Sequence, residues 1–377
     1  MYDINLKIIE GLPYKYNIYS MPINFPCNKY NESIKDSVIV QSFLPISDDF
    51  GTLQYVGGIC VNNKIYCTPN CADDILVYDI ENDSTYKICS GLGTNKFKYT
   101  GQVYYKGKIY MLHRGTNSMI EINPNDDTYR LIDLKLGYTV NPYDDYRDSY
   151  HYNGVLSDQG YLYQPPAYNN TDLLKINMET FSVQKISFIS DKVDTWIGCV
   201  KHPKENKIIF LSTKIFRIWN CDNDTYIDIV SENEQSCYDM VYDSRYNSFI
   251  GVSAKAGVFQ KWIAINLDDY TITESSWVNY MVTGYGICIG LDGNYYHLEG
   301  KTAFVASYDG NSFSIKNSVT TSEDMGDESP YIAGQSIDTE GNIYGIPASG
   351  KMCEITFTGV SISLPEWIVK SQFYGKY

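Results

Sequence analysis

Seven segments of the chain repeat one pattern of residues, and this repeat restricts the possible folds more than any other feature of the sequence. Each segment begins with a polar turn containing Gly, Asn or Asp and continues as a short apolar strand rich in Tyr and Ile. A strand of alternating polarity, a second polar turn and another strand then follow. The aligned residues of the seven segments, spaced 44, 53, 46, 41, 46 and 48 apart, are Tyr66, Tyr110, Tyr163, Ile209, Ile250, Tyr296 and Tyr344.

Another short strand of small and apolar residues precedes each segment, as in GGICV and TGQVYY. Each repeat therefore supplies four short antiparallel strands, and the spacing is typical of propeller blades. The sequence predicts an all-β fold, a seven-bladed β-propeller of four-stranded antiparallel blades over residues 51–364. Residues 1–50 are expected to form an N-terminal arm or closing segment, and residues 365–377 a C-terminal extension.

The repeat resembles kelch- and NHL-type propeller repeats of the NGKIYxxP kind, especially those in propeller proteins of AT-rich bacteria and their bacteriophages. The residues that carry the resemblance are NNKIYCTP with ILVYDIENDSTYKI, KGKIYMLH with MIEINPNDDTYRLI, and GNIYGIP near the C-terminus. Most repeats lack the Gly-Gly doublet of kelch, and none has the Trp-Asp ending of WD40. The resemblance implies a fold and a source, whereas function depends on loops and pockets.

Composition argues against several classes of function. The chain has 30 basic and 45 acidic residues, a net charge of −15, so no nucleic-acid partner is expected, because phosphate binding needs clustered Lys and Arg. No run of about 18 apolar residues occurs, and the N-terminal residues lack a signal-peptide pattern, so we expect no membrane insertion. Most of the ten cysteines stand singly in apolar runs, which predicts buried free thiols in a reducing compartment.

An insert between the second and third repeats, Leu136–Tyr152, is the main candidate binding site. Exposed tyrosines offer a flat apolar face and a hydroxyl, which suits glycan stacking or a protein hot spot; the alternative is a loop packed on its own blade. An acidic insert, Thr320–Tyr331, is interpreted as a solvated loop. The predicted binding residues of the first insert are Tyr138, Tyr143, Tyr146, Arg147, Tyr150 and Tyr152.

An alternative site lies at the mouth of the predicted channel and consists of His113, His297 and Glu299. A seven-bladed lyase of the streptogramin-inactivating type would place His and Glu around this mouth, and His297 with Glu299 imitates half of that arrangement. Isolated histidines in strands are more often structural. The acidic hairpins NDDT (125–128) and DNDT (222–225) are interpreted as turns, because they lack the spacing of a Ca²⁺ loop. No catalytic residue, metal or cofactor is expected.

The sequence therefore favours a non-enzymatic binding or assembly protein. We expect a bacteriophage virion component (tail, fibre or head accessory) that is assembled in the host cytoplasm and uses propeller loops for recognition. Its expected partners are other virion or scaffold proteins and a cell-surface glycan that acts as receptor. The alternatives are a carbohydrate-active or lyase-type enzyme with a site at the channel mouth, and a cytoplasmic bacterial protein-interaction scaffold.

Overall fold

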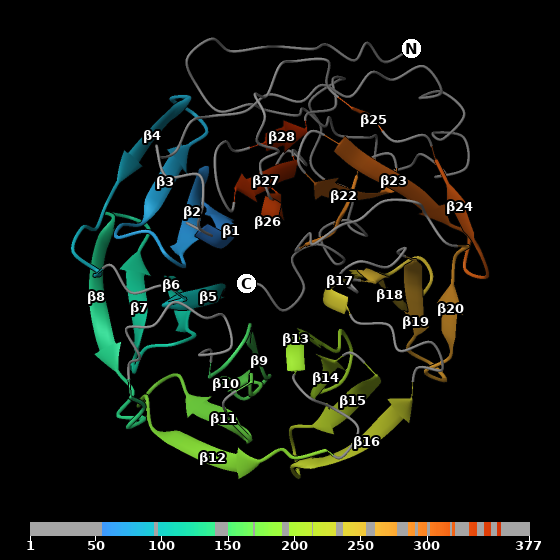
Figure 1. The fold of residues 1–377 in the computed structure, drawn as a ribbon, viewed down its shortest axis with the longest axis horizontal. Helices are drawn as coiled ribbons and strands as arrows, with labels where there is room; N and C mark the ends of the chain where they lie inside the picture. Colours follow the sequence, from blue (N-terminus) through green and yellow to red (C-terminus); the bar gives the residue numbers. More distant parts are fainter. Residues whose placement is uncertain are drawn as a thin grey trace.

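Antiparallel sheets follow one another around a central axis and form a ring in the computed structural model (Figure 1). In each sheet the strand nearest the axis comes first in the chain, and the later strands lie progressively outward. The structure describes residues 55–93, 97–139, 150–168, 170–190, 196–212, 214–230, 237–253, 261–276, 286–290, 293–299, 302–316, 319–320, 332–337, 343–347 and 353–355.

Six of these sheets are four-stranded blades, with the strand pairs joined in chain order. Blades one to three consist of β1 (Tyr55–Val61), β2 (Lys64–Pro69), β3 (Leu76–Asp79) and β4 (Ser84–Lys87); β5 (Tyr99–Tyr105), β6 (Lys108–His113), β7 (Ser118–Asn123) and β8 (Thr128–Asp133); and β9 (Val155–Leu156), β10 (Tyr161–Gln164), β11 (Asp172–Asn177) and β12 (Val183–Ser187).

Blades four to six consist of β13 (Trp196–Lys201), β14 (Lys207–Ser212), β15 (Ile215–Asn220) and β16 (Thr225–Val230); β17 (Cys237–Asp243), β18 (Ser248–Ser253), β19 (Trp262–Asn266) and β20 (Ile272–Glu274); and β21 (Cys288–Ile289), β22 (Tyr295–Glu299), β23 (Thr302–Tyr308) and β24 (Phe313–Ile315). A short additional strand, β25 (Val319–Thr320), also pairs with β23.

The expectation of seven four-stranded blades is wrong, because the described residues form six. The last repeat forms a sheet of three strands, β26 (Ile332–Ile337), β27 (Ile343–Pro347) and β28 (Cys353–Ile355), between blades six and one (Figure 1). The rest of this repeat, up to residue 364, lies outside the described residues. Outermost strands such as β8 and β16 are mostly exposed, so they lack the hydrophobic pattern that identifies a strand, and the sequence predicts them less directly than the buried strands.

The hydrophobic core lies between neighbouring blades. On β14, Ile208 and Phe210 belong to the cluster shared with blade three, whereas Ile209 and Leu211 belong to the cluster shared with blade five. All four side chains are buried, and each contributes roughly 1.5–3 kcal/mol when it is removed from water. Because successive residues of a strand point to opposite faces, a strand buried on both faces has a continuous apolar sequence, as in IIFL.

The turns that begin the repeated strand have the predicted backbone conformation. Asn62 and Asn63 between β1 and β2 have φ of 52° and 58°, and Lys106 and Gly107 between β5 and β6 have φ of 47° and 78°. Two residues of positive φ form the tight turn that matches the twist of a hairpin. The Gly, Asn and Asp content of these turns therefore follows from backbone geometry.

Acidic and amide side chains stabilise the turns between the third and fourth strands. Oδ1 of Asp126 accepts hydrogen bonds from the backbone N (3.1 Å) and the hydroxyl (2.7 Å) of Thr128. Asn223 does the same for Thr225, at 3.2 and 2.6 Å. The structure thus confirms that the NDDT and DNDT hairpins use these residues to form turns.

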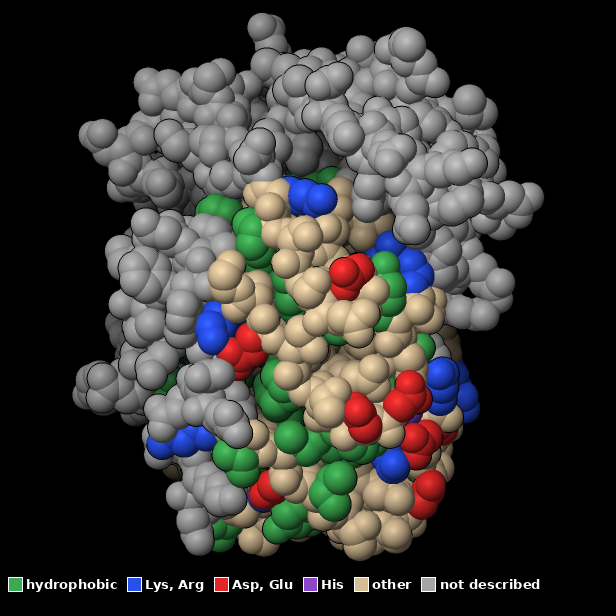
Figure 2. All heavy atoms as spheres, turned by 90° about the vertical axis from the view of Figure 1, so that its right-hand side faces the viewer, with side chains coloured by type: hydrophobic (Ala, Val, Ile, Leu, Met, Phe, Trp, Pro, Cys, Tyr) green, Lys and Arg blue, Asp and Glu red, His purple; other side chains and the backbone are tan. Residues whose placement is uncertain are grey.

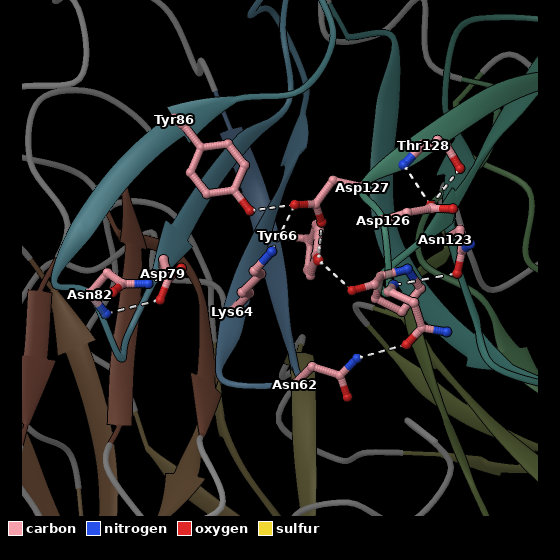
Figure 3. Close-up of polar contacts among 12 residues, drawn as sticks. Asn62, Lys64, Tyr66, Asp79, Asn82, Tyr86, Asn123, Asp126, Asp127 and Thr128 are labelled. Carbon is pink, nitrogen blue, oxygen red and sulfur yellow. Dashed lines mark hydrogen bonds and ion pairs between the residues drawn. The ribbon is translucent and has the colours of Figure 1, made fainter.

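Asp127 and Asp224, which follow the turn-forming Asp126 and Asn223, connect their blades to the preceding ones. Asp127 has φ of 58°, and its carboxylate accepts hydrogen bonds from Lys64 Nζ (2.7 Å), Tyr66 OH (2.6 Å) and Tyr86 OH (2.6 Å), all on blade one (Figure 3). Partial burial opposes ionisation of Asp127, but these three donors lower its pKa below the usual value. We call this contact a carboxylate bridge.

Similar carboxylate bridges join the next blades. Asp224 of blade four accepts from Lys175 Nζ (2.8 Å) and Tyr163 OH (3.4 Å) of blade three. Glu179 of blade three accepts from Tyr105 OH of blade two at 2.7 Å. These contacts lie at the end of the blades that carries the β7–β8, β11–β12 and β15–β16 turns. They supply directional contacts that the apolar clusters between blades lack.

The rim of the ring has a mixed surface. Figure 2 shows acidic, basic and hydrophobic side chains interspersed over the described part of the right-hand side of Figure 1. No helix among the described residues is both long and apolar enough to cross a bilayer.

We expect Asp127→Asn to lower the free energy of unfolding by about 2 kcal/mol. The amide keeps the turn but removes the charge that Lys64 and the two tyrosines contact. Asp126→Asn is the matched control, and it should cost less than about 0.5 kcal/mol, because Asn223 already performs this role in blade four. Urea denaturation of the three proteins measures both effects; equal losses from the two substitutions would contradict the bridge.

Candidate functional site at the junction of blades two and three

The Tyr-rich insert leaves blade two after β8 and enters blade three before β9, so its described ends lie at the junction of these blades. Tyr138 and Tyr150 are half-buried, and Tyr152 is buried. Tyr143, Tyr146 and Arg147 lie outside the described residues.

Tyr138 and Tyr150 stack on each other at the base of the insert. Their ring centroids are 4.2 Å apart and their planes differ by 9°. The Asn117 amide bonds to both the backbone N and the backbone O of Tyr138, each at 2.8 Å. Lys185 Nζ of blade three lies 4.8 Å from the Tyr138 ring centroid, so both blades fix the position of this ring.

The C-terminal end of the insert is held through its backbone. Tyr150 N donates to the Arg114 carbonyl at 2.9 Å, and Ala167 N donates to the Tyr150 carbonyl at 2.8 Å. The Arg114 guanidinium carbon lies 4.7 Å from the Phe97 ring centroid and 5.0 Å from that of Tyr152. A guanidinium between two aromatic faces is a stabilising cation–π arrangement, so Tyr152 anchors the insert and offers no free ring.

Two histidines lie beneath the stacked tyrosines. His113 is the last residue of β6, and its ring centroid is 4.9 Å from that of His151. His151 forms a β-bridge with Pro166 just before the first strand of blade three. The equivalent positions, at the start of the first strand, are Tyr99 in blade two and Trp196 in blade four. Both imidazoles are fully buried. The structure thus brings a residue of the channel-mouth hypothesis, His113, next to residues of the insert.

Hydrogen-bond geometry defines the tautomer of His151. Its Nδ1 lies 3.1 Å from the Pro165 carbonyl oxygen, which can only accept, so Nδ1 carries the proton. Its Nε2 is therefore the acceptor for Tyr138 OH at 2.9 Å and for Asn170 Nδ2 at 2.6 Å. By the same reasoning His113 Nδ1 donates to the Thr116 carbonyl at 3.2 Å.

Burial controls the ionisation of this cluster. Removal from water lowers the pKa of His113 to about 3 and holds the pKa of His151 well below its usual value, with His113 adding to the effect at His151. Burial also raises the pKa of Tyr138 to about 12. The cluster is therefore neutral at pH 7 and can bond and position groups, but it does not supply a proton donor near neutrality.

His297 of the channel-mouth hypothesis is also a buried residue. Its Nδ1 lies 2.9 Å from the Gly286 carbonyl oxygen, and burial lowers its pKa to about 4. The side chain of Glu299, on β22, lies outside the described residues. His113 belongs to blade two and His297 to blade six, so at least two other sheets separate them around the ring.

Two residues of the cluster were not predicted from the sequence. Asn170 Nδ2 contacts both Tyr138 OH, at 2.8 Å, and His151. Gln164 Nε2 donates to the backbone carbonyl of His113 at 2.5 Å. Gln164 lies in a repeated strand, but nothing in the sequence marks either residue as part of a site, and only the folding of blade three against blade two places them here.

The cysteines occupy interior positions, as predicted. Seven of the eight described cysteines are buried, and Cys71 is half-buried. Burial raises the pKa of Cys221 to about 12, so this thiol is protonated at pH 7. Within the described ranges, no group of three or more His, Cys, Asp or Glu side chains is arranged to hold a metal ion.

Comparison with known proteins supports the fold and does not define a family. No family model and no curated protein matches the chain. The prediction of a seven-bladed kelch- or NHL-like propeller is wrong in its number of blades, because the described residues form six four-stranded blades.

Solved structures with propeller folds do resemble the chain. A streptogramin B lyase shares 10% identity over 85% of this chain and 98% of its own, with a TM-score of 0.66. A catalytically inactive virginiamycin B lyase from Staphylococcus aureus, solved with quinupristin, shares 10% identity over 85% of this chain and 99% of its own, with a TM-score of 0.64. The extracellular domain of a putative one-component system from B. thetaiotaomicron shares 12% identity over 82% of this chain, with a TM-score of 0.60. The match covers 39% of that domain, so this chain spans well under half of its length. At these identities the likeness concerns the fold alone.

The buried histidines should make the free energy of unfolding depend on pH. All four histidines of the chain are buried, and burial lowers the pKa of each. The unfolded chain binds protons below about pH 6.5 and the folded chain does not, so the stability present above pH 6.5 is lost as the pH falls. With four such groups the slope approaches about 5 kcal/mol per pH unit.

Urea denaturation at pH 7.5, 6.5 and 5.5 would measure this slope, because most carboxylates titrate at lower pH. His113→Gln removes one titrating group, so the slope should fall by up to about 1.4 kcal/mol per pH unit. A free energy of unfolding that stays constant between pH 7 and 5 would contradict the burial of neutral imidazoles.

Proposed function

We propose that the chain is a non-enzymatic binding and assembly protein and that the insert 136–152 is its recognition element. The observation that carries the proposal is the fixed base of this insert. Tyr138 is bonded through both its backbone groups, Tyr150 is bonded to two blades, and their rings stack. Recognition loops on a rigid scaffold bind with a smaller loss of conformational entropy.

The neutral histidine cluster supports binding over catalysis at this junction. His113 and His151 are buried beneath the tyrosines, with low pKa values that are unsuited to proton transfer near pH 7. His151 accepts a hydrogen bond from Tyr138 OH, and His113 packs against the rings of both residues, so the two histidines support a surface that a ligand would contact. Aromatic side chains with few rotatable bonds are common in protein and glycan recognition sites.

The proposal includes the expectation of a bacteriophage virion component that contacts other virion proteins or a cell-surface glycan. The resemblance of the repeats to those in propeller proteins of bacteriophages supports this part. Protein mass spectrometry of purified particles tests it. The chain should be present at a constant ratio to the capsid protein. Its absence from the particle would leave the cellular scaffold as the remaining binding role.

We expect Tyr143→Ala combined with Tyr146→Ala to weaken binding to a bacterial glycan array by at least about tenfold, because the insert would lose its two central aromatic side chains. Tyr129→Ala is the matched control, since Tyr129 is 42% exposed on β8 and lies outside the insert. Equal losses from both proteins, or no loss from either, would contradict recognition by the insert.

The alternative is a lyase-type enzyme with a site at the channel mouth, and the fold likeness to the streptogramin B and virginiamycin B lyases motivates a direct test. We expect quinupristin incubated with the chain to keep its mass and retention time in liquid chromatography–mass spectrometry. The buried, neutral His297 offers no accessible acid or base. Turnover that is abolished by His297→Ala would contradict the binding proposal and establish the enzyme.

A further inference from the structure

The outer strand of blade four, β16, is an exposed sheet edge with an unusual sequence. It is the last strand of its sheet, so one of its two backbone edges faces away from β15. Tyr226, Ile227 and Val230 are 48%, 55% and 53% exposed. Six residues of β structure with an apolar surface form a template on which another strand can pair.

The other five four-stranded blades protect their outer strands. Four of these strands, β4, β12, β20 and β24, have only three to five residues, and β8, which is as long as β16, ends in the charged Asp133. Short edges and charged side chains are the usual protections against edge-to-edge association. Other charges on these strands are paired within their own blades, as Lys87 is with Asp74, Arg130 with Glu121 and Glu274 with Lys261.

The single charge of β16 does not provide this protection, because it is paired within the blade. Asp228 accepts hydrogen bonds from Arg217 Nε at 2.7 Å and Nη2 at 2.9 Å. Arg217 is 1% exposed, and its guanidinium carbon lies 3.8 Å from the Tyr226 ring centroid. The pair keeps the carboxylate beside β15 and leaves a long apolar edge without a free charge.

We propose that β16 pairs with β16 of a second copy of this chain about a two-fold axis. Antiparallel pairing centred on Ile227 places Ile227 opposite its own copy and Thr225 opposite Ile229. The same register places Tyr226 opposite Asp228, so that a phenol donor faces a carboxylate acceptor. The strand is thus complementary to itself, as a two-fold interface requires, and the pairing joins two blades into one continuous sheet.

Salt dependence distinguishes a second copy from a basic partner. Each chain carries a net charge of −15, so two copies repel at long range and added salt should strengthen their association. A positively charged peptide on the same edge would bind less tightly as the salt concentration rises. The self-complementary register and the absence of free charge on β16 favour the second copy.

Sedimentation equilibrium of the full chain at low and high salt tests the proposal. We expect a monomer–dimer equilibrium that shifts toward dimer with salt, and we expect Ile227→Lys to raise the dissociation constant at least about tenfold. Leu131→Lys on β8 is the matched control, because Leu131 is 53% exposed, and it should leave the equilibrium unchanged.

Cross-linking tests the register. Ile227→Cys should give a covalent dimer with a short bis-maleimide, because the two copies of residue 227 face each other across the axis, whereas Leu131→Cys should not exceed the background of the unsubstituted chain. A monomer at all concentrations and salt levels, or a dimer that Ile227→Lys does not weaken, would overturn the proposal. Glycan binding by the insert is measured separately, so failure of one idea leaves the other intact.

Discussion

The contact between neighbouring blades determines the rest of this structure. Each blade is a small sheet that is apolar on both faces, so neither face can be left in water. On β14 alternate residues serve the two neighbours, with Phe210 packed toward blade three and Leu211 toward blade five. A sheet of this kind is stable only between two others, and arranging the sheets in a ring provides both neighbours for each one.

Polar contacts between blades supply the precision that apolar packing lacks. The carboxylate bridge at Asp127 contacts three donors of the preceding blade, and Asp224 repeats part of the arrangement two blades later. The same turn that stabilises a hairpin thus also joins two blades. With the sheets held in this way, the connections between blades are the part of the fold that can vary, and the Tyr-rich insert is one such connection.

The chemistry of the candidate site depends on burial, which changes the interpretation of its histidines. In the sequence His113 and His297 are candidates for catalysis, because histidine titrates near pH 7. In the structure both imidazoles are excluded from solvent, donate from Nδ1 to a backbone carbonyl and are neutral. Their contribution is then to fix neighbouring groups, and for His113 that group is the tyrosine stack at the base of the insert.

The sequence by itself determined the strands, their turns and the chain order within the blades, because alternating polarity and positive-φ residues are local properties. It did not determine that the last repeat has three strands in the described structure, since an exposed outer strand has little hydrophobic signal. It identified Tyr138, Tyr150 and His113 separately. Only the packing of blade three on blade two, which aligns residues far apart in the chain, brought them together with His151 and Asn170.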